Sequence, residues 1–176
     1  MRIISGKLRG KILRAPNNLP VRPTTDFAKE ALFSLVNNHY DIEQISVLDL
    51  FAGTGNISYE FASRGAESIT AVDNNGNCVK FINATAQALD FTQIQAHRAE
   101  ALKFVERAYR KWDVVFADPP YDFPDHLALV NLVFEKQILA EEGMFILEHS
   151  RDTKLEDHPN FIESRKYGNV HFSFFE

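Results

Sequence analysis

The sequence predicts an α/β fold, built on a doubly wound and mostly parallel sheet of seven strands with a small N-terminal β-hairpin extension. From residue 46 onward, short apolar segments that resemble strands alternate with longer segments of helical periodicity. That order is typical of parallel strands joined by right-handed crossovers, with helices on both faces. A glycine turn, Gly53-Thr54-Gly55, follows the first strand. The chain closes with two antiparallel strands within residues 161–175, around Tyr167-Gly168-Asn169.

The first 25 residues are expected to form a basic arm in front of a single domain of residues 26–176. Residues 2–5 and 7–13 alternate in polarity and are separated by Gly6, which predicts the hairpin. A loop rich in Pro and Asn follows. Thr24 or Thr25 then caps a helix over about residues 26–38. The apolar stripe of this helix consists of Phe27, Ala31, Leu32, Leu35 and Val36.

The parallel part of the sheet is expected to contain five strands with helices between them. The strand candidates are residues 46–51, 68–72, 93–97, 113–117 and 143–149. The helical segments lie at about 56–64, 75–90, 99–110 and 125–140. In an open sheet of this kind the ligand binds beyond the carboxyl ends of the strands. The polar motifs of the chain follow strands, so we expect them to gather at that edge.

Length and composition favour one cytoplasmic domain. With 176 residues the chain can bury roughly 70% of its unfolded surface. It has no run of about 18 apolar residues and no signal-peptide pattern, so we expect no membrane segment. Cys78 is the single cysteine, which excludes an internal disulfide. Without a cluster of Cys and His, we expect no metal site.

The net charge of −5 conceals two unlike regions. Residues 1–25 contain six basic residues and no acidic residue, whereas the remainder contains 13 basic and 24 acidic residues. A basic arm on an acidic body is typical of proteins that contact nucleic acid. The alternative is a solvated hairpin that happens to be basic. The candidate RNA-binding residues are Lys7, Arg9, Lys11, Arg14 and Arg22.

The segment Asp118-Pro119-Pro120-Tyr121 follows the apolar strand of residues 113–117 and indicates methyl transfer to an exocyclic amine of a nucleobase. Such an amine is a poor nucleophile and needs acceptors for its two N–H groups. The Asp118 carboxylate and the Pro119 carbonyl can provide them, because the following proline keeps the chain extended. Tyr121 offers a ring for stacking. The alternative is an ordinary turn that ends a strand.

The glycine turn and the acid after the next strand predict a nucleotide-like cofactor. Asp73 stands 24 residues beyond Asp49, where it can accept both hydroxyls of a ribose. The alternative role of Asp73 is to cap the following helix. Asp49 can order the turn or meet an ammonium group. Glu100 and Ala101 would lie near an adenine ring, or Glu100 would simply begin a helix.

Two other nucleotide-binding patterns are excluded. A dinucleotide fingerprint needs a third glycine, and Ser58 occupies that position. A phosphate-binding P-loop needs Gly-Lys-Ser or Gly-Lys-Thr, which does not follow the turn.

From Met1 to about Glu148 the chain resembles the bacterial methyltransferases that use S-adenosylmethionine to methylate N2 of a guanine in 16S ribosomal RNA. Four motifs carry the resemblance: Arg2-Ile3-Ile4-Ser5-Gly6, then Arg22-Pro23-Thr24-Thr25-Asp26 with Lys29-Glu30-Ala31-Leu32-Phe33, then Val47-Leu48-Asp49-Leu50-Phe51-Ala52-Gly53-Thr54-Gly55, and Asp118-Pro119-Pro120-Tyr121. The last two are shared by many amino-methylating enzymes, whereas the first two are more specific. Thr54 and Glu100 depart from the Ser and Asp common in that family.

The resemblance implies a Rossmann-like class I methyltransferase fold, S-adenosylmethionine as cofactor and S-adenosylhomocysteine as product. It implies 16S rRNA or the small ribosomal subunit as partner, and a monomer without metal. Asp118 to Tyr121 would hold the base. The residues assigned to the cofactor are Asp49, Phe51, Gly53, Gly55, Asp73, Asn74, Glu100 and Ala101.

Two other functions remain open. An adenine-N6 methyltransferase could use the same Asp-Pro-Pro-Tyr motif, although 176 residues leave little room for a separate target-reading insert. A non-catalytic assembly factor could bind RNA and keep the cofactor pocket as a relic. The intact Asp73 and Asp118 argue against the second.

Overall fold

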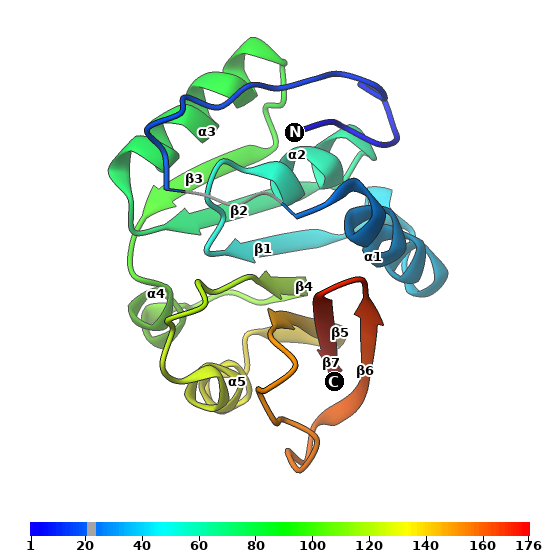
Figure 1. The fold of residues 1–176 in the computed structure, drawn as a ribbon, viewed down its shortest axis with the longest axis vertical. Coiled ribbons are helices and arrows are strands. Elements are labelled where there is room, and N and C mark those ends of the chain that lie inside the picture. The colour runs from blue at the N-terminus through cyan, green and yellow to red at the C-terminus, as the bar shows by residue number, and fades with distance from the viewer. Residues whose placement is uncertain (21–23) are drawn as a thin grey trace.

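The computed structural model describes residues 1–20 and 24–176 and contains one seven-stranded sheet (Figure 1). The strand order is β3-β2-β1-β4-β5-β7-β6. The first five strands in this order are parallel, and β7 is antiparallel to both β5 and β6. The doubly wound, mostly parallel sheet expected from the sequence is confirmed. The strands are β1 (Ser46–Leu50), β2 (Ser68–Asp73), β3 (Ile94–Arg98), β4 (Trp112–Ala117), β5 (Leu139–His149), β6 (Phe161–Tyr167) and β7 (Val170–Phe175).

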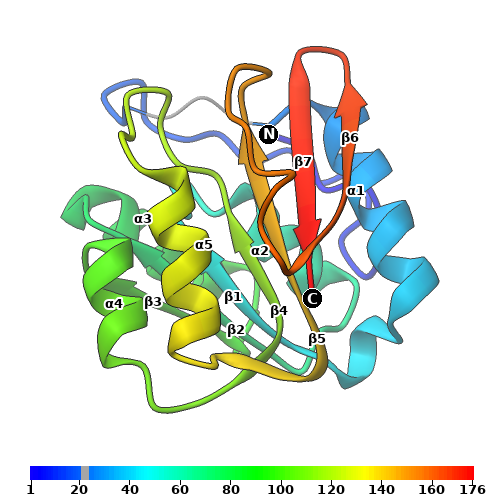
Figure 2. The ribbon, with the colours of Figure 1, turned by 90° about the horizontal axis from the view of Figure 1, so that it is seen from below.

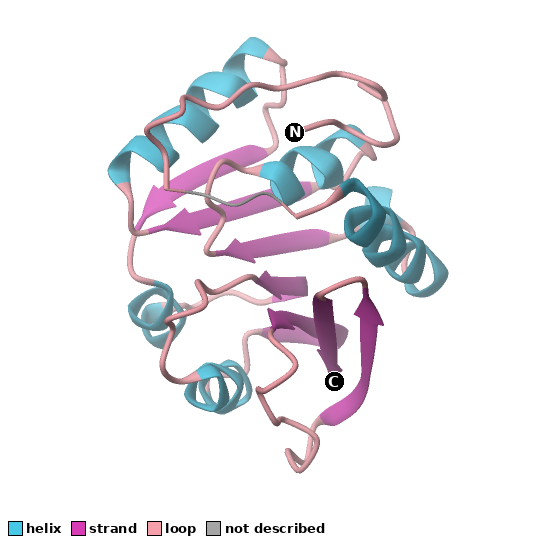
Figure 3. Cartoon of the chain, in the orientation of Figure 1, coloured by secondary structure: helices cyan, strands magenta, loops and turns pink. Residues whose placement is uncertain are grey.

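Five α-helices cover the two faces of this sheet, as Figures 1 and 3 show. Helices α1, α2 and α3 lie on one face, and α4 and α5 lie on the other, where they stand in front of the sheet in Figure 2. A short 3-10 helix, Ile42–Gln44, precedes β1. The α-helices are α1 (Asp26–His39), α2 (Asn56–Ser63), α3 (Gly76–Ala88), α4 (Ala101–Arg107) and α5 (His126–Glu135).

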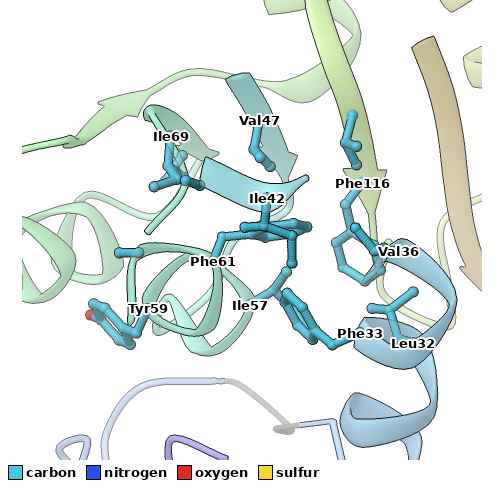
Figure 4. Close-up of a cluster of buried hydrophobic side chains, with 14 of the residues drawn as sticks. Leu32, Phe33, Val36, Ile42, Val47, Ile57, Tyr59, Phe61, Ile69 and Phe116 are labelled. Carbon is cyan, nitrogen blue, oxygen red and sulfur yellow. The ribbon is translucent and has the colours of Figure 1, made fainter. Parts of the chain in front are cut away.

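The larger core lies between the sheet and the helices α1 to α3. Figure 4 shows part of it, where the rings of Phe33 and Phe61 meet edge to face with centroids 4.5 Å apart. Burial of apolar side chains of this size is the main favourable contribution to folding. The labelled members are Leu32, Phe33, Val36, Ile42, Val47, Ile57, Tyr59, Phe61, Ile69 and Phe116.

Helix α1 begins as expected but buries a different stripe. Thr25 is the N-cap, and its side chain accepts a hydrogen bond from the Ala28 N–H. The buried face contains Ala28 and Lys29, whereas Phe27 is 64% exposed. Of the expected stripe Leu32 and Val36 are buried, whereas Ala31 and Leu35 are only partly buried, and Phe33, which was not expected, is fully buried. Lys29 can belong to the buried face because its ammonium has buried polar partners, which the pattern of apolar residues does not reveal.

The segment between α5 and β5 corrects one boundary. A helix was expected to continue to about residue 140, but α5 ends at Glu135 and β5 already begins at Leu139. Gln137 has a left-handed φ of 52°, which breaks the helix, and the Ile138 carbonyl accepts the Trp112 N–H. The early part of β5 is thus held by β4, in a pairing that local periodicity does not show.

The expected N-terminal hairpin is reduced to a single bridge between Arg2 and Ile12. Four main-chain hydrogen bonds join its two arms, including Ile3 N–H to the Lys11 carbonyl at 2.9 Å and the N-terminal ammonium of Met1 to the Leu13 carbonyl at 3.0 Å. The backbone of the arm is fixed instead against α2.

Candidate active site

A cleft of about 1050 Å³ opens at the carboxyl ends of the parallel strands. It collects most of the site residues expected from the sequence. Gly55 and Ala101, which were also expected at the cofactor, do not line it. The expected residues that do line it are Asp49, Phe51, Gly53, Asp73, Asn74, Glu100, Asp118, Pro119, Pro120 and Tyr121.

The glycine turn after β1 is shaped by left-handed backbone conformations. Phe51, Gly53 and Gly55 have φ values of 58°, 56° and 88°. A Cβ on Gly55 would also lie 2.7 Å from Cζ of Tyr59, so two constraints require glycine there. Gly55 is the N-cap of α2, and its role is to let the chain enter the helix. Gly53 lies in the cleft wall itself.

Asp73 joins the end of β2 to this turn. One carboxylate oxygen accepts the Gly53 N–H at 2.8 Å, and the other accepts the Asn75 N–H at 2.9 Å. The capping role considered for Asp73 belongs to Asn75, whose side chain accepts from the N–H groups of Asn77 and Cys78. A carboxylate oxygen can accept more than one hydrogen bond, so Asp73 retains capacity to bind a ligand from the cleft.

Asp49 forms the buried floor of the cleft. Its carboxyl accepts a hydrogen bond from the Ser58 hydroxyl at 2.6 Å. Burial, the main cause, and the nearby charge of Asp73 together raise the pKa of Asp49 to about 7, despite the lowering effect of the Ser58 hydrogen bond. A cation brought beside Asp49 would favour its ionised form.

Glu100 and Ala101 are adjacent at the start of α4, but their side chains lie in different surroundings. Glu100 is exposed and lines the cleft, and its carboxylate lies 3.4 Å from the Lys103 ammonium. Its side chain does not cap the helix. Ala101 is buried in the core beside α5, so its side chain contributes packing, whereas Leu102 lines the cleft.

The Asp118-Pro119-Pro120-Tyr121 segment begins where β4 ends. The Asp118 N–H lies 3.4 Å from the Leu50 carbonyl, which joins the segment to the end of β1. The Pro120 carbonyl accepts the Phe123 N–H at 2.9 Å and closes a turn. Asp118 is half-buried, and the Tyr121 side chain is 72% exposed at the cleft mouth.

A ring contact links this segment to the glycine turn. Phe123 packs edge to face on Phe51, with centroids 5.2 Å apart. Both residues line the cleft. This apolar contact therefore fixes the position of the two motifs relative to each other. Phe123 was not anticipated from the sequence. A Phe five residues after Asp118 gives no periodic signal that would have identified it.

The described part of the arm is docked on α2. The N–H groups of Ile4 and Ser5 donate to the two carboxylate oxygens of Glu60 at 2.9 and 3.0 Å. A Cβ on Gly6, which has a φ of 84°, would lie 1.9 Å from the Ser63 carbonyl oxygen. The side chains of the four candidate RNA-binding residues Lys7, Arg9, Lys11 and Arg14 are nevertheless exposed. Arg22 lies outside the described residues.

A buried charge network holds the arm, α1 and α2 together. Lys29 and Glu60 are 1% and 0% exposed, with Nζ and Oε2 3.3 Å apart. The Lys29 ammonium also donates to the Arg2 carbonyl and to Oδ1 of Asn56, which lines the cleft. Arg64 pairs with the other oxygen of Glu60 at 3.0 Å. Burial lowers the pKa of Lys29 although Glu60 raises it.

The end of β5 contributes an acid that the sequence analysis did not assign. Glu148 lines the cleft, and Thr24 Oγ1 lies 3.4 Å from its Oε2. The neighbouring His149 is buried between the Ser150 carbonyl and the Ser173 hydroxyl, at 2.7 and 2.6 Å. Burial lowers its pKa, and a neutral ring with the proton on Nδ1 satisfies both contacts. The position of Glu148 near the end of a strand is the feature of the sequence that could have identified it as a cleft residue.

The described residues contain neither a metal-binding cluster nor a membrane-spanning helix. No group of three or more His, Cys, Asp or Glu that could hold a metal ion occurs in residues 1–20 and 24–176. Within those ranges no helix has the length and apolar character needed to cross a membrane.

Comparison with known proteins gives a family match along the chain. Residues 1–176 match the family described as conserved hypothetical protein 95, which extends the similarity beyond the expected limit at Glu148. The ribosomal RNA small subunit methyltransferase D of Haemophilus influenzae is 31% identical over 88% of this chain and 81% of its own length. YlbH of Bacillus subtilis, a candidate rRNA methyltransferase, is 34% identical over 88% and 85%.

A solved structure supports the same relationship. The candidate methyltransferase yhhF from Escherichia coli superposes with a TM-score of 0.87, at 27% identity, over 99% of this chain and 96% of its own.

Proposed function

The chain belongs to the conserved hypothetical protein 95 family, and from that premise we propose that it transfers a methyl group from S-adenosylmethionine to N2 of a guanine in small-subunit ribosomal RNA. Relatives named ribosomal RNA small subunit methyltransferase D support the reaction and the kind of RNA. The observation that carries the proposal is the cleft. The glycine turn and Asp118 to Tyr121 line the same cavity and are joined by the Phe51 to Phe123 contact.

The residues of the cleft floor fit the cofactor. When bound, S-adenosylmethionine supplies a methyl group that is already activated by its sulfonium. Asp73 is oriented by two N–H groups and can accept from ribose hydroxyls, and Asp49 can pair with the ammonium group. Phe51, Asn74 and Glu100 line the remaining wall. Gly55 acts by shaping the turn, and Ala101 by packing α4.

The target side of the cleft supports methylation of an amine. The Asp118 carboxylate and the Pro119 carbonyl would accept the two N–H groups and point the nitrogen lone pair toward the methyl group. Preorganised acceptors of this kind stabilise the charge that develops on the nitrogen. The proton then leaves to Asp118 or to water. The exposed ring of Tyr121 is available to stack on the base.

The proposal includes the arm and the setting. Phosphates would be bound by Lys7, Arg9, Lys11 and Arg14, which are exposed, and by Arg22. We also propose that the protein acts as a monomer in the cytoplasm, as one methyltransferase domain carrying the docked arm.

One assay tests the reaction. The protein is incubated with methyl-labelled S-adenosylmethionine and either unmodified small subunits or free 16S rRNA, and the labelled nucleoside is identified by mass spectrometry. N2-methylguanosine is expected. Detection of N6-methyladenosine would instead identify the protein as an adenine-N6 methyltransferase. The absence of labelled RNA would favour the non-catalytic assembly factor. Asp118→Ala should lose most of this labelling, and Asp122→Ala, which removes an exposed carboxylate four residues away, is its matched control.

A further inference from the structure

An exposed aromatic ring and a partly buried one form a pair on the α1 side of the cleft mouth. Phe27, in the first turn of α1, is 64% exposed, and Tyr167 ends β6. Their centroids lie 6.1 Å apart, and their planes are inclined by 78°. Figure 2 shows α1 running beside β6. We call this pair the Phe27–Tyr167 platform.

The platform borders the cleft through its neighbours in sequence. Thr25 lines the cleft two residues before Phe27, and Asn169 lines it two residues after Tyr167. Asp118 lines the same cleft, so nucleotides attached to a base held there can pass Thr25 and Asn169 as they leave it. The platform is therefore within the path available to the neighbouring nucleotides of a bound RNA strand.

Contacts among the described residues leave most of the Phe27 side chain exposed. The adjacent helix positions Ala28 and Lys29 are buried, and Phe27 points away from that core. An edge-to-face contact with Tyr167 leaves a face of the Phe27 ring open. Rings that are rigid, apolar and open on one face are the usual platforms for unpaired bases.

Guanidinium groups flank the two rings. Arg2 pairs with Asp26, next to Phe27, with Nη2 and Oδ2 2.9 Å apart. Arg165 lies two positions before Tyr167, on the same side of β6, and pairs with Glu163 at 3.2 Å. Arg2 also belongs to the basic arm, so cationic groups continue from the arm to the platform. This arrangement of arginines and rings matches a single strand of RNA.

We propose that the Phe27–Tyr167 platform binds, by stacking, the base of a nucleotide adjacent to the methylated guanine. The proposal rests on the proposed function, because the amine reaches Asp118 only when its guanine is unpaired, and the neighbouring base then also loses a stacking partner. Phe27 supplies the stacking face, and the edge-to-face contact with Tyr167 holds the Phe27 ring in place.

The test measures RNA binding without catalysis. A short single-stranded RNA with one guanine beside a fluorescent 2-aminopurine is titrated with the protein at several salt concentrations. The wild type should quench the 2-aminopurine. Phe27→Ala should remove most of the quenching and weaken binding about tenfold, with an unchanged salt dependence, since base stacking is independent of phosphate contacts. Tyr109→Ala removes a 98% exposed ring remote from the cleft and should change neither quantity.

Further variants separate stacking from folding. Phe27→Tyr keeps a ring and should bind like the wild type, whereas Phe27→Leu keeps apolar volume and should bind like Phe27→Ala. Equal quenching and affinity in Phe27→Ala and the wild type would overturn the platform. Sedimentation of the protein alone also decides: self-association that Phe27→Ala abolishes would assign this face to a second copy and overturn the proposal.

The methylation assay is run in parallel with these titrations. A wild type that labels no RNA overturns the proposed function, whatever the variants do. A wild type that labels guanine while Phe27→Ala binds RNA equally well overturns only the platform.

Discussion

The floor and the rim of the cleft are built in different ways. On the floor, Asp49 and Asp73 are already hydrogen-bonded to Ser58 and to the glycine turn. On the rim, the rings of Tyr121 and Phe27 are largely exposed. The carboxylates of the floor are oriented by hydrogen bonds within the chain, whereas the aromatic rings of the rim are exposed and can stack on the bases of a nucleic acid. Under the proposed function, the floor is a preformed cofactor half and the rim is a substrate half that RNA completes.

The largest expected effect comes from breaking the support behind the floor. Glu60→Ala leaves the buried Lys29 ammonium without its ion-pair partner and frees two N–H groups of the arm. Breaking a buried pair in this way costs about 3–5 kcal/mol. Urea unfolding should show that loss. Glu67→Ala, which removes an exposed carboxylate just beyond α2, is the control and should leave the midpoint nearly unchanged.

Asp118→Ala should separate the two halves functionally. Loss of one preorganised group commonly lowers turnover by a factor on the order of 100 or more, and the cofactor floor does not use Asp118. Turnover should fall while calorimetry gives nearly unchanged affinity for S-adenosylmethionine. Retained turnover would make the Asp-Pro-Pro segment a structural turn only.

RNA binding through the basic arm should depend on salt, whereas cofactor binding on the floor should not. Replacement of Lys7, Arg9, Lys11 and Arg14 by Gln should flatten the slope of log RNA affinity against log salt by roughly 3, because each phosphate contact adds about 0.7–0.9. The identity of the methylated base and the affinity for cofactor should stay the same. An unchanged slope in filter-binding titrations would show that the arm is only a solvated hairpin.

The smallest expected effect is a dependence of cofactor affinity on pH, which arises from Asp49 on the floor. The pKa of Asp49 is raised to about 7, so this carboxyl is mostly protonated below that pH in the free protein. Pairing with a cofactor ammonium needs the anion. Affinity should therefore rise about tenfold per pH unit up to about 7 and then level, which calorimetry can follow. Asp49→Asn should bind more weakly and lose this pH dependence. A wild type with a flat profile would remove Asp49 from the ammonium site.

The same shift affects stability with a definite sign. Because the pKa of Asp49 in the folded protein lies above its ordinary value of 3.8, the stability that Asp49 contributes is fully present below about 4 and is lost as pH rises through about 7.

The sequence could predict what local pattern determines. Strand and helix alternation placed β1 to β4 within a residue or two, and the rule that ligands bind at strand ends gathered Asp49, Asp73 and Asp118 in one cleft. Local pattern could not reveal contacts between distant segments. The β4 pairing that starts β5 at Leu139 is one example. Another is Lys29, whose burial depends on Glu60, 31 positions away.

The sequence could not show which side chains line the cleft, for a related reason. Ala101 and Gly55 lie next to residues that line the cleft, but the direction of each side chain or turn is set by the helix that begins there. The choice of Asn75 over Asp73 as helix cap follows from the Gly53 N–H, which Asp73 accepts. That N–H comes from a different strand-to-helix connection.

The burial of Lys29 also makes this amine a chemical reporter. Its ammonium is enclosed by the Arg2 carbonyl, Asn56 and Glu60, so an acylating reagent reaches it only after the arm lifts from α2. Lys7 and Lys11 are exposed and would be labelled without any opening. The rate of Lys29 acylation relative to Lys7 therefore measures how often the arm separates from the body, as amide exchange does for local opening. Peptide mapping could read that frequency in the unmodified protein, with no variant at all.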